Sequence, residues 1–288
     1  MEARLEEKKP EENISIEEFI GKQKISDETL ISFIQREKSV RVEELLKNVT
    51  PSPNVNVKIE KDMTPLMLAA IFNRHVILQL LLDHGADVHA LNKNNWTALH
   101  FAADSKFPNC IKPLVEAKAD VNAKDKKNDT PLHNTAYIGN VGGALELLKH
   151  KADLTIKNDY GESPFVLAAM KNQTDIFKVF LNEKKNALNE KDDIDENTAL
   201  HWAAKKGNPT IISLLLKEKA DPEITNKKGK KPVDLASSHQ SRILLEEASP
   251  ACCGCFFKNK KSEKKATITS QKEISYKPIP LSITASNR

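Results

Sequence analysis

The stretch NDTPLHNTA, Asn128–Ala136, recurs in altered form along most of the chain. Its Thr130 has counterparts at Thr64, Thr97, Ser163 and Thr198, with spacings of 33, 33, 33 and 35 residues. A further 33 residues lead to KKPVDLA, in which Lys231 takes the threonine position. The other copies are DMTPLMLAA (Asp62–Ala70), NWTALHFAA (Asn95–Ala103), GESPFVLAA (Gly161–Ala169) and ENTALHWAA (Glu196–Ala204). A fixed period of this length indicates a repeat architecture.

A second motif follows the first at a constant distance and completes each repeat. Thr–Pro starts a helix, because the hydroxyl caps free backbone N–H groups and proline is tolerated in the first turn. Leu and Ala–Ala give this helix a narrow apolar face, and a leucine run in the second motif gives another helix. One such pair cannot bury its own apolar surface, so the sequence predicts an all-α solenoid of antiparallel helix pairs with protruding hairpin-like loops. The second motif reads LLLDHGADVHA (80–90), PLVEAKADVNA (113–123), ELLKHKADLTI (146–156) and SLLLKEKADPE (213–223).

These motifs resemble the ankyrin repeat, whose TPLHxAA and GADVNA blocks stand almost unchanged in the central copies. The resemblance implies a solenoid at 26–249, and the segment at 1–25 before it is charged. Within the solenoid we expect a cap-like first repeat, about five good repeats from residue 59 and a polar terminal repeat at 226–249. The basic, cysteine-containing tail at 250–288 is rich in Ser, Thr and Pro without helical period, so we expect it to be disordered.

The loop glycine of the family pattern survives only at Gly161 and Gly229. Its replacements are Asp62, Asn95, Asn128 and Glu196. Asn and Asp tolerate left-handed backbone, whereas Glu196 is harder to place there. Glu196 also coincides with a two-residue insertion, so we expect an irregular, longer loop at 186–197.

Composition narrows the compartment and the class of partner. The net charge of +4 is too small to indicate a nucleic-acid partner. Three of the four cysteines are bunched near the C-terminus, which favours a reducing, cytoplasmic setting over a disulfide framework. The N-terminus lacks the apolar segment of a signal peptide, and there is no run of eighteen apolar residues. We expect a cytoplasmic monomer.

No catalytic or metal-binding constellation emerges from the sequence. His100, His133 and His201 share one repeat position, and the ankyrin resemblance implies that each hydrogen-bonds across the loop between repeats. The acidic stretch EKDDIDEN (190–197) lacks the spacing and glycine of a calcium loop. Cys110 lies on an apolar helix and is interpreted as a small buried hydrophobe. We expect no enzymatic activity, no cofactor and no metal.

A protein partner is expected on the concave surface of the solenoid. In the resembling family, the two residues after Ala–Ala and the loop tips face this groove. Trp202 follows a repeated histidine and is expected in the core instead. Exposed aromatic and Met side chains are typical of protein interfaces, and a basic end of the groove favours an acidic flank on the ligand. The predicted partner-binding residues are Ile71, Phe72, Trp96, Tyr137, Ile138, Tyr160, Met170, Lys205 and Lys206. The alternative is that several of these side chains fold back against neighbouring loops.

The tail sequence ACCGCFFKNKK (251–261) allows four interpretations. Zinc normally takes four ligands, and a redox cysteine needs a base or a CxxC pair. S-acylation of Cys252, Cys253 and Cys255 fits better, with Phe256, Phe257, Lys258, Lys260 and Lys261 contacting an anionic membrane. An unmodified tail is the fourth interpretation.

The whole sequence therefore predicts a non-enzymatic protein-binding module held at a cytoplasmic membrane face by its tail. One alternative is a secreted bacterial effector or inhibitor that sequesters a host protein. Another is a metal- or redox-dependent regulator that uses the cysteine cluster.

Overall fold

The computed structural model describes residues 27–48, 54–105, 108–183 and 187–249. Its internal contacts divide the chain into one unit at 1–249 and a second at 250–288. Within the described ranges the regular structure is helical, and a single β-bridge joins Lys191 to Thr198. The prediction of an all-α solenoid is confirmed.

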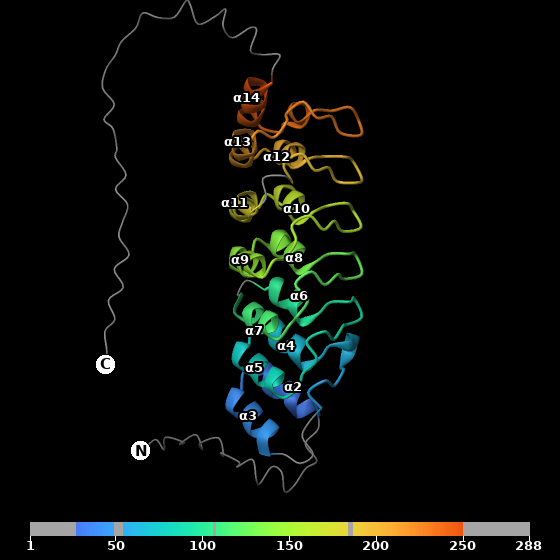
Figure 1. The fold of residues 1–288 in the computed structure, drawn as a ribbon, viewed down its shortest axis with the longest axis vertical. Helices are drawn as coiled ribbons and strands as arrows, with labels where there is room; N and C mark the ends of the chain where they lie inside the picture. The colour runs from blue at the N-terminus through green and yellow to red at the C-terminus, as the bar shows by residue number, and fades with distance from the viewer. Residues whose placement is uncertain (1–26, 49–53, 106–107, 184–186, 250–288) are drawn as a thin grey trace, which may run out of the picture. The chain divides into compact units, whose positions relative to one another are not determined.

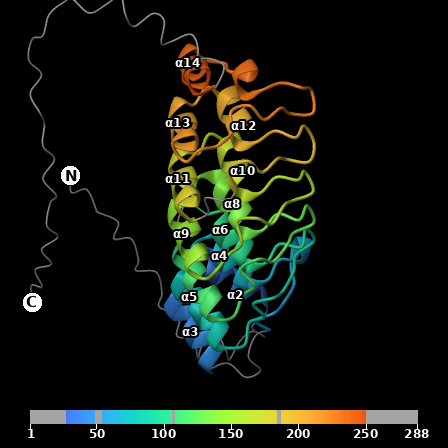
Figure 2. The same ribbon diagram turned by 45° about the horizontal axis from the view of Figure 1, so that its top comes forward.

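The helices alternate between two layers, as Figures 1 and 2 show. Consecutive helices of one layer pack on each other, and each also packs on its partner in the other layer. The layer beside the hairpins contains α2 (Asp27–Gln35), α4 (Pro65–Ile71), α6 (Ala98–Ala103), α8 (Pro131–Ile138), α10 (Pro164–Met170), α12 (Ala199–Lys206) and the 3-10 helix η4 (Pro232–Leu235). The outer layer contains α3 (Ser39–Asn48), α5 (His75–Asp83), η2 (Pro108–Cys110), α7 (Ile111–Glu116), α9 (Val141–Lys149), α11 (Thr174–Glu183), α13 (Pro209–Lys217) and α14 (His239–Ala248), while η1 (Glu60–Asp62) precedes α4.

The inner helices begin where the sequence predicts. Thr64, Thr97, Ser163 and Thr198 are N-caps whose side chains accept a hydrogen bond from the N–H three residues on. This bond satisfies one of the N–H groups that a helix leaves free at its start. Lys231 caps η4 differently, because its own N–H donates to the Asp234 carboxylate at 2.9 Å.

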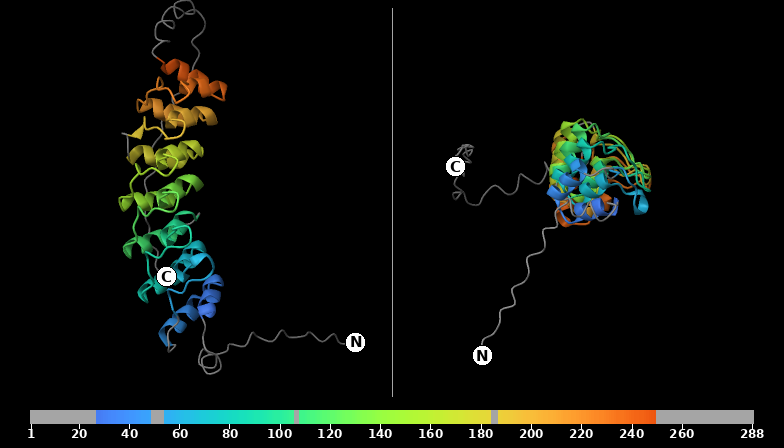
Figure 3. Two further views of the ribbon diagram at one scale, coloured as in Figure 1. Left: turned by 90° about the vertical axis from the view of Figure 1, so that its right-hand side faces the viewer. Right: turned by 90° about the horizontal axis from the view of Figure 1, so that it is seen from below.

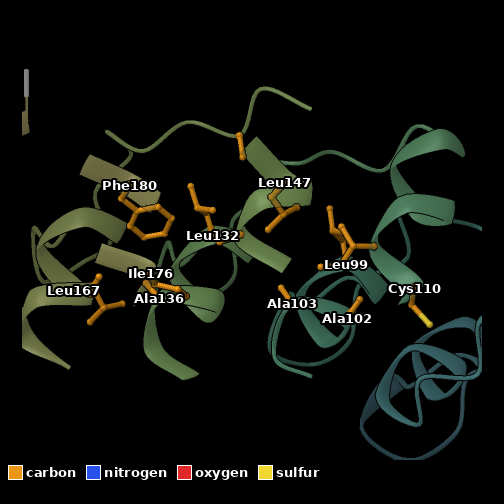
Figure 4. Close-up of a cluster of buried hydrophobic side chains, with 14 of the residues drawn as sticks. Leu99, Ala102, Ala103, Cys110, Leu132, Ala136, Leu147, Leu167, Ile176 and Phe180 are labelled. Atoms are coloured by element: carbon orange, nitrogen blue, oxygen red, sulfur yellow. The ribbon is translucent and has the colours of Figure 1, made fainter. Parts of the chain in front are cut away.

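The core runs along the stack between the two layers (Figure 4). Ala102, Ala103 and Ala136 are fully buried, and their small side chains let neighbouring inner helices approach closely. Larger side chains fill the space towards the outer layer, where Phe165 and Phe177 contact each other with ring centroids 4.7 Å apart. The repeats thus share one continuous core, because each pair buries its apolar face on its neighbours.

The hairpins all project to the same side of the stack, as the end-on view in Figure 3 shows. Glu196 adopts left-handed backbone with φ 56°, as do Asp62, Asn95 and Asn128. The expectation of an irregular, longer loop at 186–197 is confirmed in part: in the described residues the hairpin turn at 192–197 has one residue more than the other hairpins, and the Asp192 N–H donates to the Asn197 carbonyl at 2.9 Å. Residues 184–186 lie outside the described ranges.

Candidate functional site

An Asn or Asp stands at the base of five successive hairpins, and Ile59 takes this place in the hairpin before them. The Asn158 Oδ1 accepts the N–H groups of Tyr160 and Glu162, both at 3.0 Å. Asn226 repeats this arrangement with Lys228 and Lys230, again at 3.0 Å. These bonds fix the turn and therefore the side chains that the tip presents. Sequence reasoning missed this role, although an Asn or Asp stands five or six residues before each of the last five capping positions: Asn92, Asp125, Asn158, Asp192 and Asn226.

Successive hairpins are also joined through their backbones. The Lys126 N–H donates to Asn94 at 3.1 Å, and the Asp159 N–H donates to Lys127 at 2.9 Å. The Lys227 N–H continues the row by donating to Asp195 at 2.9 Å. The tips therefore form one connected edge that borders the concave surface.

Three buried histidines tie the inner helices α6, α8 and α12 to the hairpin that follows each of them. In His133 the Nδ1 accepts the Thr130 N–H at 3.0 Å, and the Nε2 lies 3.0 Å from the Glu162 carbonyl oxygen. His100 and His201 make the same two contacts, reaching the carbonyls of Asp129 and Lys230. Burial lowers the pKa of all three, and the neutral tautomer with the proton on Nε2 fits both bonds. The expectation of bonds across the loops is confirmed.

One hollow of about 200 Å³ lies between a hairpin and the ends of the inner helices α6 and α8. Trp96 and Asp129 line it from the hairpins, and Asp104 and Tyr137 line it from the helix ends. Asp104 is exposed; its N–H donates to the His100 carbonyl at 2.9 Å, while its carboxylate has no hydrogen bond or ion pair with the residues that the structure describes. Partial burial still raises the pKa of its carboxyl. Asn134, His133 and Leu167 complete the lining.

A second hollow, of about 270 Å³, follows one repeat further along and shares Tyr137 and Asp129 with the first. It adds Tyr160 and Met170, both predicted partner-binding residues. Tyr137 is 57% exposed and Tyr160 43%. Lys171 also lines this hollow, with its Nζ 4.1 Å from the centre of the Tyr137 ring.

The Trp96 side chain folds back into the structure instead of standing free at a loop tip. It is half-buried, and its indole N–H donates to the Asp125 Oδ2 at 2.8 Å. The indole stacks near His100 with ring centroids 5.9 Å apart and touches Phe101 at 4.9 Å. One part of the ring nevertheless lines the first hollow.

The remaining predicted groove residues are dispersed. Ile71 and Phe72 are exposed at the end of α4 and line neither hollow, and Ile138 is half-buried. Lys205 and Lys206 are exposed on α12 and line neither hollow. The basic end of the groove therefore lies in a different repeat from the two hollows.

The expectation that Trp202 lies in the core is confirmed in part, because Trp202 packs against the core without being fully buried in it. Its side chain is half-buried, its indole N–H donates to the Asp192 carboxylate at 2.8 Å, and the Lys205 Nζ lies 4.6 Å from the ring centre.

The described residues offer little reactive chemistry. Cys110 is fully buried, and desolvation raises the pKa of its thiol to about 12, so the reactive thiolate is absent at neutral pH. Among the described residues no cluster of three or more His, Cys, Asp or Glu side chains is arranged to hold a metal. None of the helices in those ranges is both long and apolar enough to span a membrane. The predicted acylation and membrane-contact residues, 252–261, lie outside the described residues.

A family model described as ankyrin repeats (3 copies) matches residues 31–125, 118–192 and 184–251. Among solved structures, the ankyrin repeat domain of Bcl-3 covers 75% of this chain with a TM-score of 0.67 and 23% identity. The human ASB11 ankyrin repeat domain covers 76% with a TM-score of 0.65 and 21% identity. Each similarity extends over 97% of the compared domain and reflects the shared fold.

Curated relatives match over shorter stretches. The zebrafish (Danio rerio) palmitoyltransferase ZDHHC17 is 40% identical over 65 residues, which is 23% of this chain and 10% of that protein. The human palmitoyltransferase ZDHHC13 is 33% identical over 85 residues, which is 30% of this chain and 14% of that protein. The human ankyrin repeat domain-containing protein 40 is 38% identical over 58 residues, covering 20% of this chain and 16% of that protein. The chain thus matches a sixth or less of each relative, and the likeness to the palmitoyltransferases rests on the repeats alone.

Proposed function

The chain belongs to the ankyrin-repeat family, whose repeats form protein-interaction modules, and we propose that it binds a protein partner through the concave surface around Tyr137 and Tyr160. These two rings are exposed beside neighbouring hollows. The stack does not need an apolar side chain at either position, since the core lies between the helix layers. Exposed tyrosines held next to hollows are typical anchor sites for a partner.

The fixed geometry of the surface supports this proposal. Asn158 holds the turn that carries Tyr160, and the Gln173 amide donates to the Tyr137 carbonyl at 3.3 Å. The histidine bonds from α8 to the Glu162 carbonyl hold the helix and the hairpin together. A partner therefore meets side chains that are already in place, which lowers the entropy lost on binding.

The test compares two double variants of the full chain as baits in quantitative affinity purification. Tyr137→Ala with Tyr160→Ala removes the exposed rings of the concave surface. Val76→Ala with Leu145→Ala is the matched control, because these residues are 51% and 44% exposed but lie on the outer helices α5 and α9. We expect proteins that the wild-type chain enriches to be lost at least tenfold with the first variant and retained with the second. Equal retention by both variants would contradict the proposal.

The tail sequence supports a second role, attachment to a membrane through S-acylated Cys252, Cys253 and Cys255. Three cysteines beside Phe256 and Phe257, followed by a lysine-rich stretch, combine the two signals that stable anchoring requires. We expect Cys→Ser at all three positions to move the protein from membranes to the supernatant and to abolish hydroxylamine-sensitive acylation. Cys110→Ser serves as the control that leaves both unchanged. One bound zinc per chain, lost in the triple variant, would instead favour the metal-dependent alternative.

A further inference from the structure

The hollow bordered by Trp96 and Tyr137 is too small for an ordinary small-molecule ligand. Its volume is about 200 Å³, below the range of about 300–1,000 Å³ that is typical of ligand pockets. It opens on the concave surface between a hairpin and the ends of α6 and α8. A cavity of this size and position suits one protruding side chain of a partner protein.

Its walls combine aromatic rings with carboxylates. Trp96 and Tyr137 provide the rings, Asp104 and Asp129 provide the carboxylates, and the lining contains no lysine or arginine. The Asp129 Oδ1 accepts a hydrogen bond from Asn158 at 2.9 Å, whereas the Asp104 carboxylate has no bonding partner among the described residues. Aromatic faces attract cations, and an unpaired carboxylate at the edge of an apolar hollow does the same.

The surroundings add negative charge. Asp125 lies directly behind Trp96, and Glu162 stands on the following hairpin. Burial raises the pKa of Glu162, and the charges of Asp129 and Asp192 raise it further. Lys127 and Lys171 line the second hollow beside Glu162 and offset its charge, so the unbalanced carboxylates are those of the first hollow.

The chain already places one cation on the edge of this region. The Lys171 Nζ lies over the Tyr137 ring at 4.1 Å, and Lys171 lines the second hollow but not the first. The Tyr137 ring is therefore held by one internal cation while it borders a hollow that has none. Trp96 is held by its bond to Asp125 and its contacts with His100 and Phe101. Both rings are fixed before any ligand arrives.

We propose that this hollow is a subsite for a basic side chain, arginine or lysine, that protrudes from the protein partner. The positive group lies between the Trp96 and Tyr137 rings and pairs with the Asp104 carboxylate. This inference rests on the proposed function and adds the charge of the partner's anchor to it. It also changes the expected ligand, since an acidic flank suits Lys205 and Lys206 while the centre of the groove takes a cation.

The two tryptophans of the chain make a direct test possible. The full chain is labelled with 15N, and the indole N–H signals of Trp96 and Trp202 are followed during titration with short peptides. The peptides are acetyl-Gly-Ser-X-Ser-Gly-amide, in which X is arginine, lysine, norleucine or glutamate. We expect saturable shifts of the Trp96 signal with arginine and lysine only. Trp202 is the internal control, because it lines neither hollow.

Two variants of equal charge separate the hollow from general electrostatics. Asp104→Asn is expected to weaken binding of the arginine peptide about fivefold, since it removes the carboxylate of this hollow that has no partner among the described residues. Asp83→Asn is the control, because Asp83 is exposed on the outer helix α5 and its carboxylate accepts a hydrogen bond from Gln79 of the same helix. Thermal unfolding of both variants should match that of the wild type.

The other outcomes overturn the inference. A norleucine response equal to that of arginine would show an apolar pocket, and equal shifts of both indole signals would show non-specific attraction. No shift with any peptide, or an unchanged response in Asp104→Asn, would also remove the subsite. Loss of partner capture with Tyr137→Ala and Tyr160→Ala, together with wild-type binding of the arginine peptide by Asp104→Asn, would support the proposed function and contradict the basic subsite.

Discussion

At the scale of single residues, the Asn and Asp at the base of the hairpins are not equivalent. An Asn amide donates onward, as Asn158 does to Asp129 and Asn226 does to Asn197, both at 2.9 Å. An Asp has no N–H to donate, and its second oxygen needs a donor instead. Both Asp residues receive one from a tryptophan, Asp125 from Trp96 and Asp192 from Trp202, each at 2.8 Å. An Asp at the base of a hairpin therefore holds a tryptophan side chain beside it, Trp96 at Asp125 and Trp202 at Asp192.

Trp96→Phe should lower the free energy of unfolding by about 1–3 kcal/mol, because it leaves a nearly buried carboxylate oxygen of Asp125 without a donor. Asp125→Asn should also destabilise, since it turns an amide N–H towards the indole N–H. The combined variant should be less destabilised than the sum of the two by about 1 kcal/mol. Urea unfolding of the four proteins measures this coupling, and additivity within about 0.3 kcal/mol would contradict it.

The buried histidines predict how stability depends on pH. Their pKa values are lowered in the folded state, so below about pH 6.5 the unfolded chain binds more protons and stability falls as the pH falls. Each histidine contributes at most about 1.4 kcal/mol per pH unit in this window. Above it, these groups give no pH dependence.

Urea midpoints at pH 7.5 and 5.5 test this expectation. His133→Gln should be less stable than the wild type at pH 7.5, because it loses the bonds to Thr130 and Glu162. It should also lose less stability between the two pH values. An equal or larger loss in the variant would show that His133 is not the titrating group.

At the scale of elements, the hairpins differ in how well their residues suit left-handed backbone. Glu196 occupies such a position with φ 56°, where Gly161 stands in the preceding hairpin with φ 71°. A side chain at Gly161 is not possible without movement, since a Cβ there would lie 2.1 Å from Asp193 Cγ and 2.3 Å from its backbone nitrogen. One hairpin thus requires glycine, whereas another carries a residue that pays a conformational penalty.

Glu196→Gly should raise the free energy of unfolding by about 0.5–1 kcal/mol. The ion pair that it loses with Lys191 is exposed and contributes little. Gly161→Ala is the opposite case and should destabilise by more than that amount. Thermal or urea unfolding measures both, and a less stable Glu196→Gly protein would show that the left-handed residue is not strained.

The elements and the concave surface differ in how far sequence predicts them. Thr130, Leu132 and Ala136 act within their own helix, so a local pattern reveals cap, core and close packing. The environment of Trp96 depends on Asp125, which lies 29 residues away on the next hairpin. A repeat position therefore does not reveal whether its side chain is free or hydrogen-bonded to the next hairpin. For the same reason the sequence does not show that Asp104 and Asp129 line one hollow with Trp96 and Tyr137.

At the scale of the whole molecule, the core is continuous but each repeat packs only on its neighbours. Stability in such a stack depends on nearest-neighbour contacts, so the position of a defect matters as much as its size. Central repeats have two neighbours, whereas α14 packs on α13 and η4 at the end of the described stack.

Leu132→Ala and Leu245→Ala remove similar buried side chains from α8 and α14. We expect Leu132→Ala to lower the stability of the whole stack by about 2–5 kcal/mol. Leu245→Ala should instead speed amide hydrogen exchange in α13 and α14 and leave α6 and α8 protected. Equal loss of protection along the chain in both variants would contradict a nearest-neighbour stack.

The row of histidine bonds has a consequence for a chain under tension. Met67 and Val166 take the histidine position in two repeats, and their side chains have no N–H to donate to the following hairpin. A pulling force loads the junctions in series, and those after α4 and α10 lack this crosslink. We expect optical tweezers to record partial extensions at these two junctions before the bridged repeats open; one all-or-none rupture would exclude it. The solenoid would then extend in steps under force, and the residue at the histidine position of each repeat would decide which junction opens first.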